Sequence, residues 1–163
     1  MSVTDVRKDP ETLAMTLTAE FAAGVEQVWR LWQDPRQLER WWGPPTYPAT
    51  MVEHDLSPGG KVSYFMTSPE GEQYHGWWLV TEVEAPYRLA FEDGFADGAG
   101  VPNPDMPVTT TEVRLTEDGT GTRMTIETRF PSLEAMEQLV QMGMEEGLTL
   151  AVGQMDALLS DIT

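Results

Sequence analysis

The sequence predicts an α+β fold in which one curved antiparallel β-sheet of about six to seven strands wraps around a long C-terminal α-helix. Segments in which apolar and polar residues alternate follow one another through most of the chain, and this period of two is typical of half-buried strands. Apolar residues at helical spacing occur only after the first such segment and at the C-terminal end. Strands in series with segregated helices favour α+β, and a long helix needs the broad apolar partner that a curved sheet provides.

The N-terminal part contains the first strand and two short helices. Residues 1–11 are polar, and we expect a loose N-terminal segment there. Residues 13–21 alternate between apolar and polar types, which predicts a strand. Residues 25–32 carry apolar side chains at helical spacing, and Pro35 suits the first turn of a second short helix that reaches Trp42.

The middle of the chain is expected to form strands separated by turns rich in Gly and Pro. Within residues 72–84, two glutamates near the end occupy even positions, so the odd positions, including His75 and Trp77, are expected to face the core. Residues 93–107 hold three Gly and three Pro without periodicity, which predicts a long loop. The expected strands are residues 49–56, 61–67, 72–84, 87–92, 109–116 and 122–130.

The last segment, residues 132–159, is expected to be one helix with Ser132 as its N-cap. Its inner stripe is centred on Gly143, Gly147 and Ala151. A glycine within a helix costs up to about 1 kcal/mol relative to alanine, so two of them on one face need a reason. Either the helix approaches the sheet closely or the small side chains leave a cavity, and both can hold at different points.

The composition of the chain excludes several classes of functional site and partner. The chain has 163 residues, no cysteine, and 10 Lys+Arg against 27 Asp+Glu, for a net charge of −17. The length is that of one domain over residues 1–163. Without cysteine there are no disulfides, thiolate metal sites or cysteine nucleophiles. The negative charge argues against nucleic acid and anionic membrane surfaces as partners, because phosphates are repelled. No signal-peptide pattern or membrane-length apolar run is visible, so a cytoplasmic location is expected.

Several motifs occur in a specific order from about residue 13 to residue 159. They are VWRLW at 28–32, DP at 34–35, LERWWGP at 38–44, DLSPGG at 55–60, HG at 75–76, PYRL at 86–89 and GTRMT at 121–125. With this series the chain resembles the SRPBCC (START-like) superfamily and, more closely, stand-alone bacterial proteins related to the activator of the 90-kDa heat-shock protein ATPase. The resemblance implies the helix-grip fold, in which a curved sheet grips the C-terminal helix with a cavity between them.

The candidate ligand-binding residues lie on the expected concave face of the sheet and on the inner face of the helix. Trp41 and Trp42 either line the cavity mouth or close the short helices onto the sheet. Methionine side chains are flexible and suit a pocket that accepts varied ligands. The full set is Trp41, Trp42, Tyr64, Met66, His75, Trp77, Phe91, Met124, Gly143 and Gly147.

The two histidines are the candidates for chemistry. His75 in an apolar cavity could act as a general acid or base, and it is the candidate catalytic residue, with Tyr64 or His54 in support. The simpler interpretation, which we favour, is that each histidine is a core residue satisfied by one hydrogen bond. A metal site built on the two histidines and Asp55 is not expected, because His54 and Asp55 are adjacent on a strand and point to opposite faces. The motifs of nucleophilic hydrolases, phosphate-binding loops and zinc proteases are absent from the sequence, and no cofactor is expected.

Three functional hypotheses follow. The first is a small-molecule-binding protein that holds a hydrophobic or aromatic ligand between sheet and helix. The second is an enzyme that uses His75, since relatives with this fold include aromatase/cyclases. The third, implied only by the name of the resembling family, is a module that regulates a chaperone ATPase, and a chaperone partner is not expected. An exposed edge strand makes a homodimer plausible.

Overall fold

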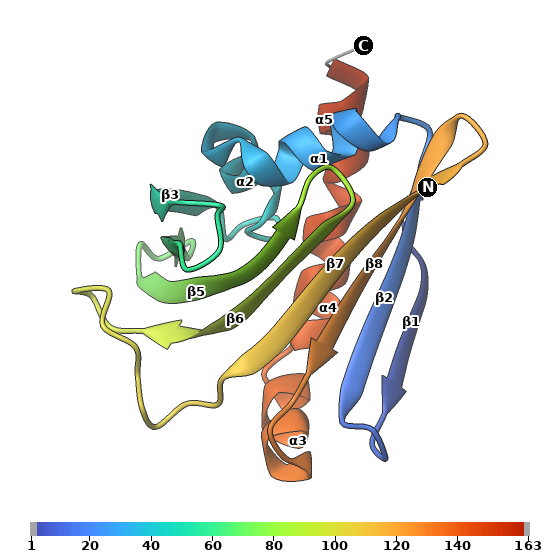
Figure 1. Ribbon diagram of the computed structural model, residues 1–163. Helices are drawn as coiled ribbons and strands as arrows, with labels where there is room; N and C mark the ends of the chain where they lie inside the picture. Colours follow the sequence, from blue (N-terminus) through green and yellow to red (C-terminus); the bar gives the residue numbers. More distant parts are fainter. Residues whose placement is uncertain (1–2, 162–163) are drawn as a thin grey trace.

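The computed structural model describes residues 3–161 and contains one antiparallel sheet of eight strands with helices against one face (Figure 1). The sheet order is β1-β2-β8-β7-β6-β5-β4-β3. The expected α+β architecture is confirmed, with one or two strands more than predicted. The strands are β1 (Val3–Asp9), β2 (Ala14–Phe21), β3 (Ala49–His54), β4 (Lys61–Thr67), β5 (Gln73–Glu84), β6 (Arg88–Ala96), β7 (Thr109–Asp118) and β8 (Gly121–Arg129).

The additional strand is β1, where the sequence predicted a loose segment. It pairs antiparallel with β2 from Val3 opposite Ala19 to Asp9 opposite Ala14. Its side chains are mostly exposed, and Val3 and Val6 are the ones that pack against the core. An edge strand held mainly by backbone hydrogen bonds needs little apolar periodicity, which explains why the pattern did not reveal it.

The two short helices follow β2 as predicted. They are α1 (Val25–Gln33) and α2 (Pro35–Trp41). Asp34 ends the first and caps the second, because its carboxylate accepts a hydrogen bond from the backbone N–H of Arg36 at 2.9 Å. Both helices lie across the end of the sheet, above β5 in Figure 1.

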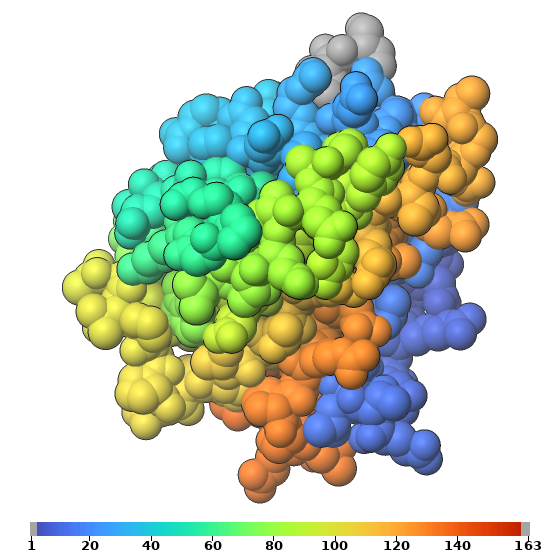
Figure 2. All heavy atoms as spheres, in the orientation of Figure 1, coloured from blue at the N-terminus to red at the C-terminus, as the bar shows by residue number. Residues whose placement is uncertain are grey.

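The C-terminal helix consists of three helical segments rather than the single helix that was predicted. They are α3 (Leu133–Gln141), α4 (Met144–Gly153) and α5 (Met155–Asp161). Gly143 separates α3 from α4 in a left-handed conformation, with φ of 91°, which glycine adopts without steric cost. The segments follow one another behind the sheet, whose atoms hide α4 in the space-filling view (Figures 1 and 2).

The core lies between the concave face of the sheet and the helices, and tryptophan dominates the end near α1 and α2. Trp32 and Trp41 are fully buried with ring centroids 4.7 Å apart, and Trp42 lies 5.0 Å from Trp78. Trp78 stacks on Phe91 at 4.0 Å. Such contacts between large rings stabilise this end of the molecule beyond the burial of their area.

The face of β5 that points to the core is opposite to the predicted one along most of the strand. The buried residues are Gly76, Trp78 and Val80, so His75 and Trp77 lie on the outer face. A register shift between Val80 and Glu82 marks a β-bulge, after which the parity of the inward positions changes. The prediction depended on the two glutamates that follow the bulge, and it is correct for that end of the strand. The extra residue in the bulge reverses which positions face the core along the rest of the strand.

Candidate functional site

A cavity of about 320 Å³ lies between the concave face of the sheet and helices α3 and α4. Strands β4 to β8 contribute its floor and walls, and Trp42 and Pro44 close one side. Two of the lining side chains, Tyr74 and Met142, are more than half exposed, and they mark where the cavity meets solvent. The larger apolar lining residues are Met66, Phe95, Ile126, Leu139, Met144 and Leu148.

Two glycines form part of the helical side of the cavity, as the sequence predicted, for different reasons. A Cβ placed on Gly147 would meet no heavy atom within 4 Å, so the space beside this helical residue is open. Gly143 breaks the helix with its positive φ and borders the same space. Of the two explanations considered for these glycines, the cavity applies here rather than close contact with the sheet.

The floor carries a polar stripe across β6, β7 and β8. Asp93, Thr109, Thr111 and Thr128 all line the cavity. The Asp93 carboxylate oxygen Oδ1 accepts a short hydrogen bond from the Thr109 hydroxyl and another, at 3.2 Å, from the Thr111 hydroxyl. Thr109 pairs with Asp93 across the sheet, which explains why these side chains meet.

Asp93 has an unusual environment for a carboxyl group. Burial raises its pKa to about 6 from the ordinary value of 3.8, although the hydrogen bonds from Thr109 and Thr111 oppose that rise. It is the only Asp, Glu, Lys or Arg among the residues that line the cavity. A carboxyl that titrates close to neutral pH in an apolar cavity can accept hydrogen bonds, bind a cation or exchange a proton.

Tyr64 lies beside this carboxyl. Burial raises the pKa of its hydroxyl, and the nearby Asp93 raises it further, whereas the indole N–H groups of Trp42 and Trp78 lower it. Neither indole N–H, however, makes a hydrogen bond of normal geometry within the described residues, and both are buried. Of these two residues only Trp42 lines the cavity, so this end of the cavity holds an indole N–H whose hydrogen-bonding capacity is unused among the described residues.

Five predicted binding residues other than His75 line the cavity, and four do not. Trp42, Tyr64, Met66, Gly143 and Gly147 are in its walls. Trp41 is a core residue whose Nε1 donates to the carbonyl oxygen of Leu31 at 2.9 Å. Phe91 and Met124 face inward as expected but are fully buried in packing contacts. Trp77 lies on the outer face and donates from Nε1 to the carbonyl oxygen of Phe95 at 3.1 Å.

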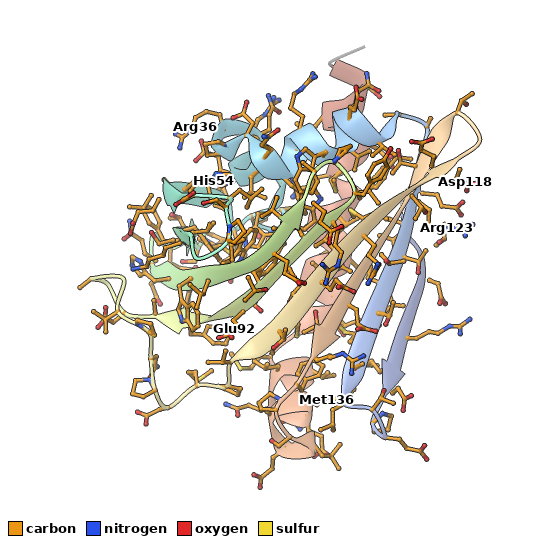
Figure 3. All side chains as sticks on the ribbon, in the orientation of Figure 1. Arg36, His54, Glu92, Asp118, Arg123 and Met136 are labelled. Atoms are coloured by element: carbon orange, nitrogen blue, oxygen red, sulfur yellow. The ribbon has the colours of Figure 1, made fainter. Side chains whose placement is uncertain are left out.

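The histidines do not present a base to the cavity interior. His75 borders the cavity at its edge, but its ring packs against Phe65 on the outer face, with centroids 5.5 Å apart. His54, labelled in Figure 3, lies on β3 with Nε2 at 3.1 Å from the carbonyl oxygen of Trp32. A role for His75 as a base stays a prediction, and its ring contact with Phe65 does not support that role. Within residues 3–161, no group of three His, Asp or Glu side chains is placed to hold a metal ion.

Asp93 was missed because the predicted strand ended at Glu92. The structure extends β6 to Ala96, so the alternation of Leu89 and Phe91 continues inward to Asp93. Glu92, labelled in Figure 3, lies between Phe91 and Asp93 in the strand, and its side chain belongs to the outer face. The signal in the sequence that could have revealed this carboxyl is its spacing: it continues the every-second-residue pattern of two apolar residues that face the core.

Comparisons with known proteins agree with this architecture. A family model described as Activator of Hsp90 ATPase homolog 1-like protein matches residues 22–160. The crystal structure of protein Ms6760 from Mycobacterium smegmatis is 52% identical over 96% of each chain, with a TM-score of 0.90. The solution structure of a protein from Arthrobacter aurescens is 50% identical, with a TM-score of 0.94, over 98% of this chain and 93% of that one.

A more distant structure shares the fold. A protein from Staphylococcus epidermidis is 23% identical over 98% of this chain and 96% of that one, with a TM-score of 0.85. A comparison with curated proteins finds no match. Among the described residues, no helix is long and apolar enough to cross a membrane.

Proposed function

The chain belongs to the Activator of Hsp90 ATPase homolog 1-like protein family, and on that premise we propose that it is a small-molecule-binding protein with its ligand between the sheet and helices α3 and α4. The ligand has a hydrophobic or aromatic body. The family is named after an activator of an ATPase. We do not propose that activity for this chain, because the cavity supports ligand binding and says nothing about an ATPase.

The observation that carries the proposal is the cavity of about 320 Å³, which lies against the core and opens to solvent at Tyr74 and Met142. Small-molecule sites are commonly apolar cavities of about 300 Å³ or more with a few polar groups. A folded protein fills such space with side chains unless something else occupies it, because voids forfeit packing contacts. Here the helix carries Gly147 where a larger side chain would fit, which supports a functional use of the space.

The experiment compares two glycine variants of the same helix. Gly147→Leu places a side chain into the cavity, and Gly153→Leu is the matched control, because its Cβ also meets no atom within 4 Å and Gly153 is not a lining residue. Both changes favour the helix, so both variants are expected to fold. Binding of 2-naphthalenemethanol, a neutral aromatic probe, is measured by isothermal titration calorimetry.

The expected result is saturable binding to the wild type and to Gly153→Leu, with affinity at least about tenfold weaker in Gly147→Leu. The leucine side chain takes the space of part of the probe, and the apolar contact that the probe loses is worth more than about 1.4 kcal/mol. No binding to the wild type by this probe or by its charged analogues overturns the proposal. Equal binding by the two variants places the probe elsewhere and overturns it as well.

A further inference from the structure

Asp93 is an acidic side chain without a cationic partner. None of the ion pairs within residues 3–161 involves it, and the cavity lining contains no Lys or Arg. Glu112, on the outer face of the same sheet, pairs by contrast with both Arg88 and Arg114. Taking a carboxylate out of water without a counter-charge is unfavourable, and the neutral form or an added cation relieves it.

The hydrogen bonds of Asp93 leave one side of the carboxyl group available. Thr109 and Thr111 both donate to Oδ1, and no described residue donates to Oδ2. An ionised carboxylate has about four acceptor positions, so these two bonds use about half of them. The remaining capacity lies at a group that lines the cavity.

The surroundings of Asp93 favour a cationic nitrogen over other ligand groups. Tyr64 and Trp42 are aromatic lining residues at the same end of the cavity, and aromatic faces attract organic cations. The net charge of −17 raises the local concentration of cations and lowers that of anions. An anionic ligand would add a second negative charge beside Asp93, which the apolar walls would not screen.

We propose that the cavity selects a hydrophobic amine, with its protonated nitrogen hydrogen-bonded to Asp93 and its apolar body against the residues of helices α3 and α4. This proposal rests on the proposed function and specifies the ligand class for the same site. Asp93 is the specificity-determining residue, and the hydroxyl of Tyr64 is the second polar contact at the nitrogen.

The test uses three aromatic probes of similar size and different charge. They are 2-naphthylmethylamine, 2-naphthalenemethanol and 2-naphthoate, titrated calorimetrically into the wild type at about pH 8, where Asp93 is ionised. The amine is expected to bind at least about tenfold more tightly than the alcohol, because a hydrogen bond between charged groups is stronger than one between neutral groups. The anion is expected to bind most weakly.

The matched variant is Asp93→Asn, whose amide oxygen still accepts from Thr109 and Thr111. It is expected to abolish the preference for the amine and to retain binding of the alcohol, with an unchanged circular dichroism spectrum. The wild-type preference is also expected to decrease as the pH falls to about 5, where Asp93 takes up a proton. The other titratable lining groups are Tyr64, Tyr74 and His75, so His75→Gln serves as a control that must leave this pH dependence intact.

The outcomes separate the two proposals. Failure of all three probes to bind overturns the proposed function and this inference together. Binding of the alcohol with no preference for the amine, or a preference that survives in Asp93→Asn, overturns this inference and leaves the proposed function standing. A pH dependence that disappears in His75→Gln assigns the selectivity to the imidazole and also overturns the role given to Asp93.

Discussion

Tyr64 lies directly over Gly76, so close that a Cβ on residue 76 would be 2.5 Å from the tyrosine hydroxyl oxygen. The two residues are opposite each other on β4 and β5. Only glycine leaves room for the ring in this position, which holds the hydroxyl at the polar end of the cavity. Gly76→Ala is therefore expected to displace Tyr64 and to weaken binding of the naphthalene probes by about tenfold, at a cost of about 1–3 kcal/mol in stability.

Gly94→Ala provides the control for that prediction. The backbone of Gly94 borders the cavity, but a Cβ on this residue would point to the outer face, where it would be 2.9 Å from Nε1 of Trp77. The variant therefore creates a similar clash on the side of the sheet that faces away from the cavity. Urea denaturation should give a comparable loss of stability, and calorimetry should give probe affinity within about twofold of the wild type. If both variants weaken probe binding equally, the position of Tyr64 does not determine the affinity for the probes, and the prediction is wrong.

The pKa of Asp93 predicts an unusual dependence of stability on pH. Its folded pKa of about 6 lies above its ordinary value of 3.8, so the folded state binds the proton more tightly. The carboxyl therefore contributes most to stability below about pH 4, and this contribution is lost as the pH rises through about 6. Asp93→Asn is expected to be more stable than the wild type by about 1–3 kcal/mol at about pH 8, and the difference should shrink as the pH falls. Urea denaturation at several pH values measures it, and a constant difference would contradict the assignment.

The two cavity glycines are expected to respond to alanine with opposite signs. Gly143 has a φ of 91°, which strains any residue with a Cβ, so Gly143→Ala should lower the free energy of unfolding by about 1–2 kcal/mol. Gly147 lies within α4 beside open space, so Gly147→Ala should raise it by about 0.5–1 kcal/mol. Chemical denaturation of both variants tests this, and changes of the same sign would refute it.

Arg88 joins three strands on the outer face. It pairs with Glu82, with Glu84 at 3.1 Å and with Glu112 at 2.6 Å, and its side chain is only 20% exposed. Burial raises the pKa of Glu112, but Arg88 and Arg114 outweigh it, so the net shift is downward. Arg88→Met should therefore lower the free energy of unfolding near neutral pH by more than the loss of one exposed ion pair does, and the loss should diminish in acid as the glutamates protonate.

Arg123→Met is the matched control for Arg88. Its Nη2 lies 3.6 Å from carboxylate oxygens of both Glu20 and Asp118, and its side chain is 52% exposed. Exposed pairs of this kind contribute little, so the change in stability should stay below about 0.5 kcal/mol. Thermal denaturation of the two variants side by side distinguishes a structural ion-pair network from ordinary surface charge.

Most of the fold was predictable because each prediction depended on local chemistry. The alternation in residues 13–21, Pro35 at the start of α2 and Ser132 at the start of α3 each specify an element on their own, and all three are confirmed. Trp41 and Trp42 show the limit of predictions that depend on local chemistry. The sequence does not distinguish these neighbours, yet the first fills the core and the second lines the cavity.

The errors concern features that depend on partner strands. The bulge near Val80 reverses which face of β5 points inward, and only the register with β6 reveals it. The inward direction of Asp93 likewise follows from the full length of β6 and its pairing with β7. The candidate site consequently lost His75 and Trp77 as interior groups and gained a carboxyl that periodicity alone assigned to a loop.

The left-handed residue at Gly143 also has a consequence for how changes in the length of α3 act on the rest of this chain. In a continuous helix, each residue turns the following ones by about 100°, so an insertion at one end rotates every later side chain away from its contacts. The break at Gly143 stops that rotation from passing from α3 to α4. The number of residues in α3 can therefore change while Ala151 and Met155 keep their buried positions in the core.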